Sequence, residues 1–96
     1  MDEALAPELQ RYVEHLRVER RLAPRSVKMV HDALLRLQQT AAQAQVDLRQ
    51  VQVQHVRRWA AMLRERPLAP RSIAIHLSAW RGLYRWWGRN GEVRVN

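Results

Sequence analysis

The pentapeptide Leu-Ala-Pro-Arg-Ser occurs twice in this chain, at 22–26 and at 68–72, and a β-branched residue follows each copy. Proline is favoured at the first position of a helix, because its missing N–H would have no partner there and its ring presets the helical φ. It also pushes the preceding alanine into the extended conformation of an N-cap. The leucine before this cap and the β-branched residue after the serine have the spacing of a hydrophobic staple. The repeat therefore predicts helix starts at Pro24 and Pro70.

Apolar residues recur at helical spacing after both starts, and the chain has only three glycines and four prolines. A third Leu-Ala-Pro, at 5–7, starts or kinks a first helix in the same way. Pro67 ends the third helix, and Gly91 is the expected left-handed residue after the last one. The segment 46–52 is ambiguous, because its Val-Gln-Val alternation also fits a strand. We expect one all-α domain in residues 1–96, with four helices at about 3–21, 24–44, 53–66 and 70–89.

Several classes of protein are disfavoured by what the chain lacks. Its 96 residues include no cysteine, which excludes disulfides and thiolate metal sites. It begins with acidic residues rather than with a signal peptide, and no apolar run approaches the length of a membrane span. The sequence therefore predicts a cytoplasmic protein that is not inserted into a membrane.

Charge is unevenly distributed along the chain, whose formal net charge is +8. Residues 1–19 carry five acidic residues against two arginines, whereas residues 66–91 carry five arginines and no acidic residue. This asymmetry indicates a polyanionic partner, with nucleic acid ahead of a membrane surface. A solvated basic surface without a partner is the alternative.

Two of the expected helices carry basic stripes opposite their apolar faces. In the fourth helix the stripe consists of Arg71, Ser78, Arg81, Arg85 and Arg89, interleaved with the small residues Ala74 and Gly82. In the second helix it consists of Arg25, Lys28, Met29 and Arg36. Each helix has arginine and then serine in its first turn, where the helix dipole, free amides and a guanidinium can meet a phosphate. Few aromatic residues are interleaved with the arginines, so helices bound to a duplex fit better than bases stacked on a single strand.

Motifs for catalysis or cofactor binding are absent from the sequence. There is no glycine-rich phosphate loop, no HExxH and no Gly-x-Ser-x-Gly, and the four histidines are not spaced as a metal-ligand set. Tyr12 and Tyr84 both lie on apolar stripes, which favours core packing over a role as nucleophile. We assign no catalytic residue, metal or cofactor to this chain.

Two stretches resemble the N-terminal, SAM-like core-binding domain of the tyrosine recombinases, in particular the XerC/XerD group, with XerC favoured. The first, YVEHLRVERRLAPRSVKMVHDAL, is similar to that family's first helix, its Glu-Arg-x-Leu-Ser-Pro corner and the start of its second helix. The second, LAPRSIAIHLSAWRGLYRWWGRNGEVRVN, is similar to the last helix and the exit toward the interdomain linker. Together with the segment between them, the resemblance covers essentially the whole chain.

The resemblance implies a compact four-helix bundle of orthogonally packed hairpins that forms one jaw of a C-shaped clamp on duplex DNA. The parent would be an enzyme, a site-specific recombinase that acts through a 3′-phosphotyrosine. Its catalytic residues would lie in a C-terminal domain that this chain does not contain. It would resolve chromosome dimers with a paralogous, XerD-like subunit in a tetramer on DNA, in the cytoplasm and associated with the nucleoid.

Carried over by position, the family's groove-facing residues fall on the two helices that the repeat starts. On the second helix they are Arg25, Ser26, Lys28 and Met29, and on the fourth they are Arg71, Ser72, Ile75, Ser78 and Arg81. The basic stripes add Arg36 and Arg85. The sequence departs from the family pattern at five positions: alanine replaces the usual capping serine at 23 and 69, His76 stands where many relatives have arginine, and Trp80 and Trp86 stand where aliphatic or small residues are commoner. The acidic first helix is a candidate for contacts with neighbouring subunits.

Three other interpretations remain open, in decreasing order of preference. The chain could be the core-binding domain of a phage or integron integrase, a free-standing helical DNA-binding protein, or a helical protein-interaction module.

Overall fold

The computed structural model describes residues 3–91. In this part of the chain it contains four α-helices and one 3-10 turn, and no strand. The all-α prediction is therefore confirmed. The exit motif at 92–96 and the acidic residues at 1–2 lie outside the described residues. None of the helices described is both long and apolar enough to cross a bilayer. The elements are α1 (Pro7–Val18), α2 (Pro24–Ala44), η1 (Leu48–Gln50), α3 (Val53–Arg64) and α4 (Pro70–Arg89).

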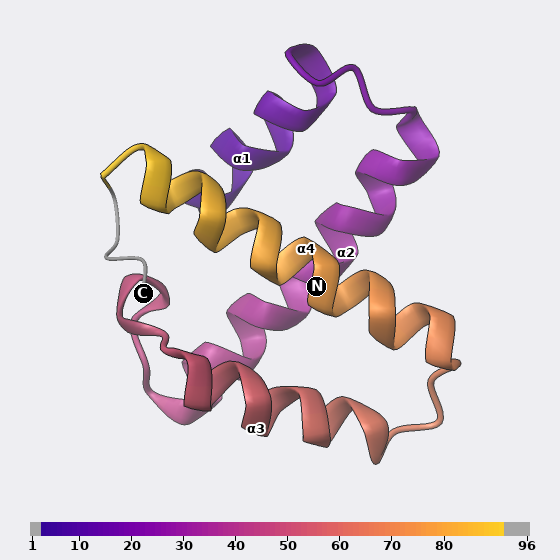
Figure 1. Ribbon diagram of the computed structural model, residues 1–96, viewed down its shortest axis with the longest axis vertical. Coiled ribbons are helices and arrows are strands. Elements are labelled where there is room, and N and C mark those ends of the chain that lie inside the picture. Colours follow the sequence, from indigo (N-terminus) through magenta and orange to yellow (C-terminus); the bar gives the residue numbers. More distant parts are fainter. Residues whose placement is uncertain (1–2, 92–96) are drawn as a thin grey trace.

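The helices form two hairpins, α1 with α2 and α3 with α4, and α4 runs across α2 (Figure 1). The packing of α2 against α4 is the most extensive between any two helices of the described region. This arrangement agrees with the expected SAM-like bundle. It brings the two helices that start with the repeated pentapeptide together in the middle of the molecule.

Proline stands at the first position of three of the helices, namely at Pro7, Pro24 and Pro70. The alanine before each proline serves as the N-cap, with φ near −60° and ψ near 146° and without a side-chain hydrogen bond. The prediction of helix starts at 24 and 70 is confirmed. The third Leu-Ala-Pro starts α1 at Pro7, so the expected start near residue 3 was wrong.

Gln38 of α2 explains why α1 begins no earlier. Its Oε1 accepts a hydrogen bond of 2.7 Å from the Ala6 N–H, and its Nε2 donates one of 2.9 Å to the Ala4 carbonyl oxygen. These two bonds hold residues 4–6 in a non-helical conformation against α2. The amide of the N-cap residue thus finds its partner 32 positions away.

Two helices also end earlier than expected. α1 stops at Val18 rather than near 21, because Arg21 adopts a left-handed conformation with φ 52° and the chain turns there. α3 stops at Arg64 rather than at 66, because Pro67 disfavours the helical conformation of the residue before it. Gly91 has φ +73°, as expected of a glycine that follows a helix.

The core lies between the four helices and is dominated by leucine and tryptophan. Its largest fully buried side chains are Trp80, Trp87, Leu9, Leu34, Leu37 and Leu83. Trp80 stands where the resemblance leads us to expect an aliphatic or small residue. It is accommodated because its indole N–H donates to the Ala33 carbonyl oxygen of α2 at 2.8 Å.

The ambiguous segment between α2 and α3 contains η1 and no strand. The Tyr84 hydroxyl of α4 donates a hydrogen bond of 2.8 Å to the Leu48 carbonyl oxygen. The Arg49 guanidinium lies 2.8 Å from Glu8 of α1 and 4.9 Å from the centroid of the Trp87 ring. These contacts fix the segment to two helices although it has little regular structure of its own.

Candidate nucleic-acid interface

A groove of about 430 Å³ opens between the end of α1, the first turns of α2 and the outer face of α4. From α2 it is lined by Ser26, Met29 and Val30, and from α4 by Ile75, Ser78, Ala79 and Gly82. The α1 side contributes Tyr12 and Leu16, and the loop after α1 contributes Leu22. The groove therefore joins surfaces from three helices that are separate in the sequence.

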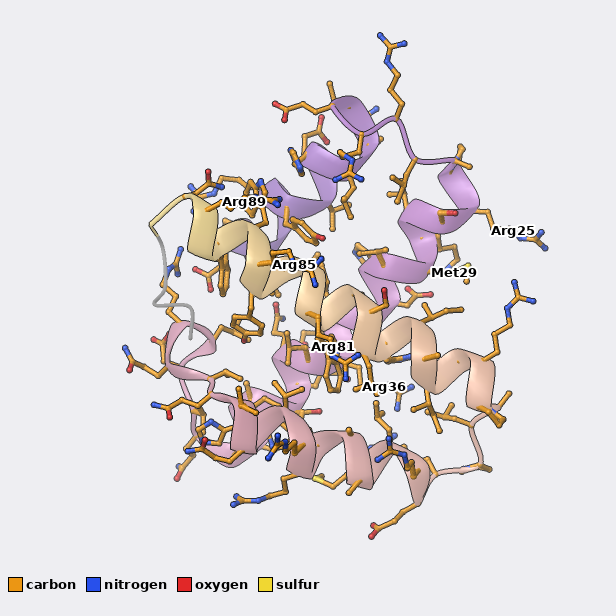
Figure 2. The ribbon with its side chains drawn as sticks, in the orientation of Figure 1. Arg25, Met29, Arg36, Arg81, Arg85 and Arg89 are labelled. Carbon is orange, nitrogen blue, oxygen red and sulfur yellow. The ribbon has the colours of Figure 1, made fainter. Side chains whose placement is uncertain are left out.

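Three arginines complete the lining of the groove: Arg20 from the loop after α1, and Arg85 and Arg89 from the second half of α4. Figure 2 shows Arg81, Arg85 and Arg89 following one another along α4, and Arg25 and Met29 projecting from the start of α2. Among the described residues that line the groove, none is acidic. The groove thus combines an apolar floor with cationic edges.

The structure brings five of the predicted site residues together in this groove: Ser26, Met29, Ile75, Ser78 and Arg85. Each residue pair Ser26/Met29 and Ile75/Ser78 lies one helical turn apart, so both helices present a hydroxyl beside an apolar side chain. This shared surface results from the packing of α2 against α4.

The other six predicted residues lie outside the groove lining. Arg25 and Arg71 are exposed in the first turns of α2 and α4, and Arg81 is exposed on α4. Arg36 is half-buried in the middle of α2. Ser72 is half-buried, and its carbonyl oxygen contacts the His76 Nδ1 at 2.7 Å. Lys28 is exposed and paired with a carboxylate. The assignment of all eleven to DNA contacts stays a prediction.

That carboxylate belongs to Asp32, which interrupts the basic stripe of α2. Its Oδ2 lies 3.2 Å from the Lys28 Nζ, and its Oδ1 lies 3.5 Å from the His31 Nδ1. Asp32 is four residues before Arg36 and three after Met29, so it shares their side of the helix. Asp32 thus places an acidic residue within a surface that the sequence predicts to bind a polyanion.

Two groove residues, Arg20 and Arg89, were not among the predicted site residues, although Arg89 belonged to the predicted basic stripe of the fourth helix. The periodicity of α4 could have identified Arg89. Arg20 follows α1, and only the left-handed turn at Arg21 directs the chain back past this end of the groove.

The pKa of Tyr12 is affected by the arginines at this end of the groove. Burial raises the pKa of Tyr12 above its ordinary value, while the charges of Arg20, Arg89 and Arg85 act in the opposite direction. The tyrosine hydroxyl therefore stays protonated at neutral pH, close to three guanidinium groups.

Gly82 of α4 faces Tyr12 of α1 at a position with no room for a larger side chain. A Cβ atom built at Gly82 would lie 2.5 Å from the Tyr12 hydroxyl oxygen. The small residue in the stripe thus accommodates a neighbouring helix. Ala74, the other small residue in the stripe, is exposed.

Two further departures from the family pattern, His76 and Trp86, lie away from the open surface. His76 is buried, and its ring meets the Trp80 ring edge to face at 6.3 Å. Trp86 is half-buried, with its ring 5.3 Å from those of Tyr12 and His15. Both side chains support the packing of α4. Within residues 3–91 no cluster of three potential metal ligands is found.

Comparison with known proteins places these features in a family. Residues 9–91 match the model of the phage integrase N-terminal SAM-like domain. The chain is 40% identical over 93 residues to a tyrosine recombinase XerC of Ralstonia pickettii, covering 94% of this chain and 28% of the relative. It is 36% identical over 96 residues to a tyrosine recombinase XerC of Chromobacterium violaceum, covering 100% of this chain and 30% of the relative. The chain thus spans less than a third of the length of these relatives. No solved structure matches it significantly.

Proposed function

Because the chain belongs to the family of phage integrase N-terminal SAM-like domains, we propose that it is the DNA-binding region of a tyrosine recombinase and holds duplex DNA against the groove. The observation that carries this proposal is the lining of the groove, which contains three arginines and no acidic residue. The other lining residues come mostly from α2 and α4, the two helices that begin within the repeated pentapeptide. Guanidinium groups neutralise phosphates and position a duplex. The side chains on the floor of the groove, between the arginines, are then free to contact the edges of the bases.

Duplex DNA fits this surface better than a single strand does. Base stacking on a single strand needs exposed aromatic rings, and in the described chain the tryptophans are buried or half-buried. The major groove of DNA admits helices, and the protein groove is lined by the first turns of α2 on one side and by one face of α4 on the other.

For the whole protein we propose a site-specific recombinase that cuts and rejoins strands through a 3′-phosphotyrosine, with its catalytic residues in the portion of the relatives that this chain does not match. The relatives' designation as XerC supports the resolution of chromosome dimers, with a paralogous XerD-like subunit in a tetramer. Such a protein works in the cytoplasm on the nucleoid. An integrase of a phage or integron is the alternative that shares the family and the chemistry.

The test is a salt titration of binding between residues 1–96 and a fluorescent duplex that carries a recombination half-site, with a scrambled duplex for comparison. If the three groove arginines contact phosphates, log K falls with log salt at a slope of about −2.7 or steeper. The double variant Arg85→Ala/Arg89→Ala should reduce the magnitude of this slope by about 1.8. The matched control is Arg57→Ala/Arg58→Ala, which removes two exposed arginines from α3.

Tighter binding to the half-site than to the scrambled duplex would support a role in site recognition. Absence of binding at low salt would overturn the proposal and leave the arginines as a solvated surface. Equal effects of the two double variants would assign the affinity to net charge rather than to the groove.

A further inference from the structure

We propose that the floor of the groove recognises the 5-methyl groups of thymine in the major groove, through Met29 of α2 and Ile75 of α4. This inference rests on the proposed duplex binding and adds to it the chemical feature of the DNA that the domain distinguishes.

The two side chains place apolar atoms on the surface of the groove that a duplex would contact. Both are half-buried and line the groove, so part of each is open to solvent between cationic residues. Arg85 and Arg89 lie on the same side of α4 as Ile75 and attract the phosphates. A duplex held by these arginines would bring the base edges over the apolar floor, and burial against a methyl group would then remove apolar surface from water.

The chemistry of the lining restricts which base edges can be recognised. Asparagine or glutamine recognises adenine, and aspartate or glutamate accepts from the cytosine amino group. Among the described residues that line the groove, none carries a carboxamide or a carboxylate. The arginines can bind guanine, and the serines can bond to several bases. Contact with the thymine methyl is then the remaining way to identify an A·T pair, and Met29 and Ile75 supply it.

The neighbouring hydroxyls fit the same interpretation. Ser26 precedes Met29 by one turn, and Ser78 follows Ile75 by one turn. Each apolar side chain therefore has a hydrogen-bonding group beside it that can reach the polar edge of the same or the next base pair. The arrangement is repeated on two helices that face each other across the groove.

The experiment compares two 30-base-pair duplexes of alternating sequence, one of adenine and thymine and one of adenine and uracil. They differ in the major groove only by the thymine methyl. We expect the uracil duplex to bind at least about fourfold more weakly, the value for one buried methyl-sized group, with an unchanged salt slope. A second pair tests the converse, because inosine–cytosine duplexes should bind more tightly when the cytosine is 5-methylated.

Variants assign the effect to the groove floor. Met29→Ala and Ile75→Ala should each reduce the preference for thymine over uracil, and the double variant should abolish it. Met62→Ala is the matched control, since Met62 is an exposed methionine on α3 outside the groove lining. Circular dichroism establishes that each variant is folded, and Ile75→Val provides a milder change if Ile75→Ala is unstable.

The outcomes separate this inference from the proposed function. Equal affinity for the thymine and uracil duplexes, with a steep salt dependence, would overturn methyl recognition and leave duplex binding intact. A preference that persists in the double variant would also overturn it. Failure to bind any of the duplexes at low salt would overturn the proposed function itself.

Discussion

The indole N–H of Trp80 donates a hydrogen bond of 2.8 Å to the backbone carbonyl oxygen of Ala33, joining the middle of α4 to the middle of α2. Both residues are almost completely buried, with exposed fractions of 1% and 0%. The bond joins α2 and α4, the two helices that contribute most of the groove lining. The geometry of the candidate site therefore depends on a residue that does not line it.

We expect Trp80→Phe to lower the free energy of unfolding by about 2–4 kcal/mol, because it removes a hydrogen bond and leaves a cavity where the second ring was. Urea denaturation followed by circular dichroism measures this change. Trp86→Phe is the control at a half-buried position of the same helix and should cost about 1 kcal/mol. Similar losses for the two variants would contradict a special role of Trp80.

Gly82→Ala should destabilise the domain by about 1–3 kcal/mol, because the new methyl group would overlap the Tyr12 hydroxyl. Tyr12→Phe removes that oxygen, so the double variant should recover most of the loss. A double-mutant cycle in urea quantifies the coupling between the two positions. Purely additive effects would show that the cost of Gly82→Ala does not come from overlap with the Tyr12 hydroxyl.

Gln45→Gly should stabilise the domain by about 0.5–1 kcal/mol. Gln45 has φ 57°, and its N–H donates to the Ala42 carbonyl oxygen while that of Val46 donates to Ala41, the pattern of a Schellman motif. Glycine adopts this left-handed conformation without the steric cost of a Cβ atom. Gln45→Ala keeps the Cβ and serves as the control, so thermal melts should show a gain for glycine and none for alanine.

Tyr84 makes stability depend on alkaline pH. Burial, reinforced by the charge of Asp47, raises the pKa of Tyr84 far above its ordinary value of 10.0. Above about pH 10 the unfolded chain therefore loses this proton while the folded one keeps it, and stability falls with a slope of about 1.4 kcal/mol per pH unit from this group. Tyr84→Phe should make the decline shallower between about pH 10 and 12. At pH 7 it should cost about 1 kcal/mol for the lost bond to Leu48.

The helix starts at Pro24 and Pro70 were predictable from the sequence because their cause is local: a proline ring and the extended residue before it. The start of α1 was not, because Gln38 holds residues 4–6 from 32 positions away. The turn at Arg21 has no sequence signal, since arginine does not favour the left-handed conformation.

In the candidate site, too, features with a local cause were predictable from the sequence, and features that depend on tertiary packing were not. Helical periodicity placed Ser78 and Arg85 on one face, and the structure brings both into the groove. Arg20 could be assigned to the groove only from the tertiary fold, because its place in the lining depends on where the end of α1 packs. Gly82 belonged to the predicted stripe, but its spatial neighbour on α1 could be found only in three dimensions.

Asp32 provides the sharpest test of which side of α2 faces DNA. Its carboxylate pairs with Lys28 at 3.2 Å on an exposed surface, and such pairs contribute little to stability. If this side of α2 faces DNA, the Asp32 carboxylate repels phosphates, and its ion pair keeps Lys28 from contacting a phosphate. Asp32→Asn should therefore strengthen duplex binding about two- to fivefold at 0.1 M salt. The free energy of unfolding should change by less than about 0.5 kcal/mol.

Freeing Lys28 for a phosphate contact should also steepen the salt slope by about 0.9. Glu65→Gln removes an exposed carboxylate at the end of α3 and leaves the same net charge as Asp32→Asn. A gain in affinity confined to Asp32→Asn would place its side of α2 against the DNA. Equal gains for the two variants would reduce the effect to net charge, and no gain would turn this side of α2 away from the duplex, since a charge at an interface acts within about 10 Å at this salt.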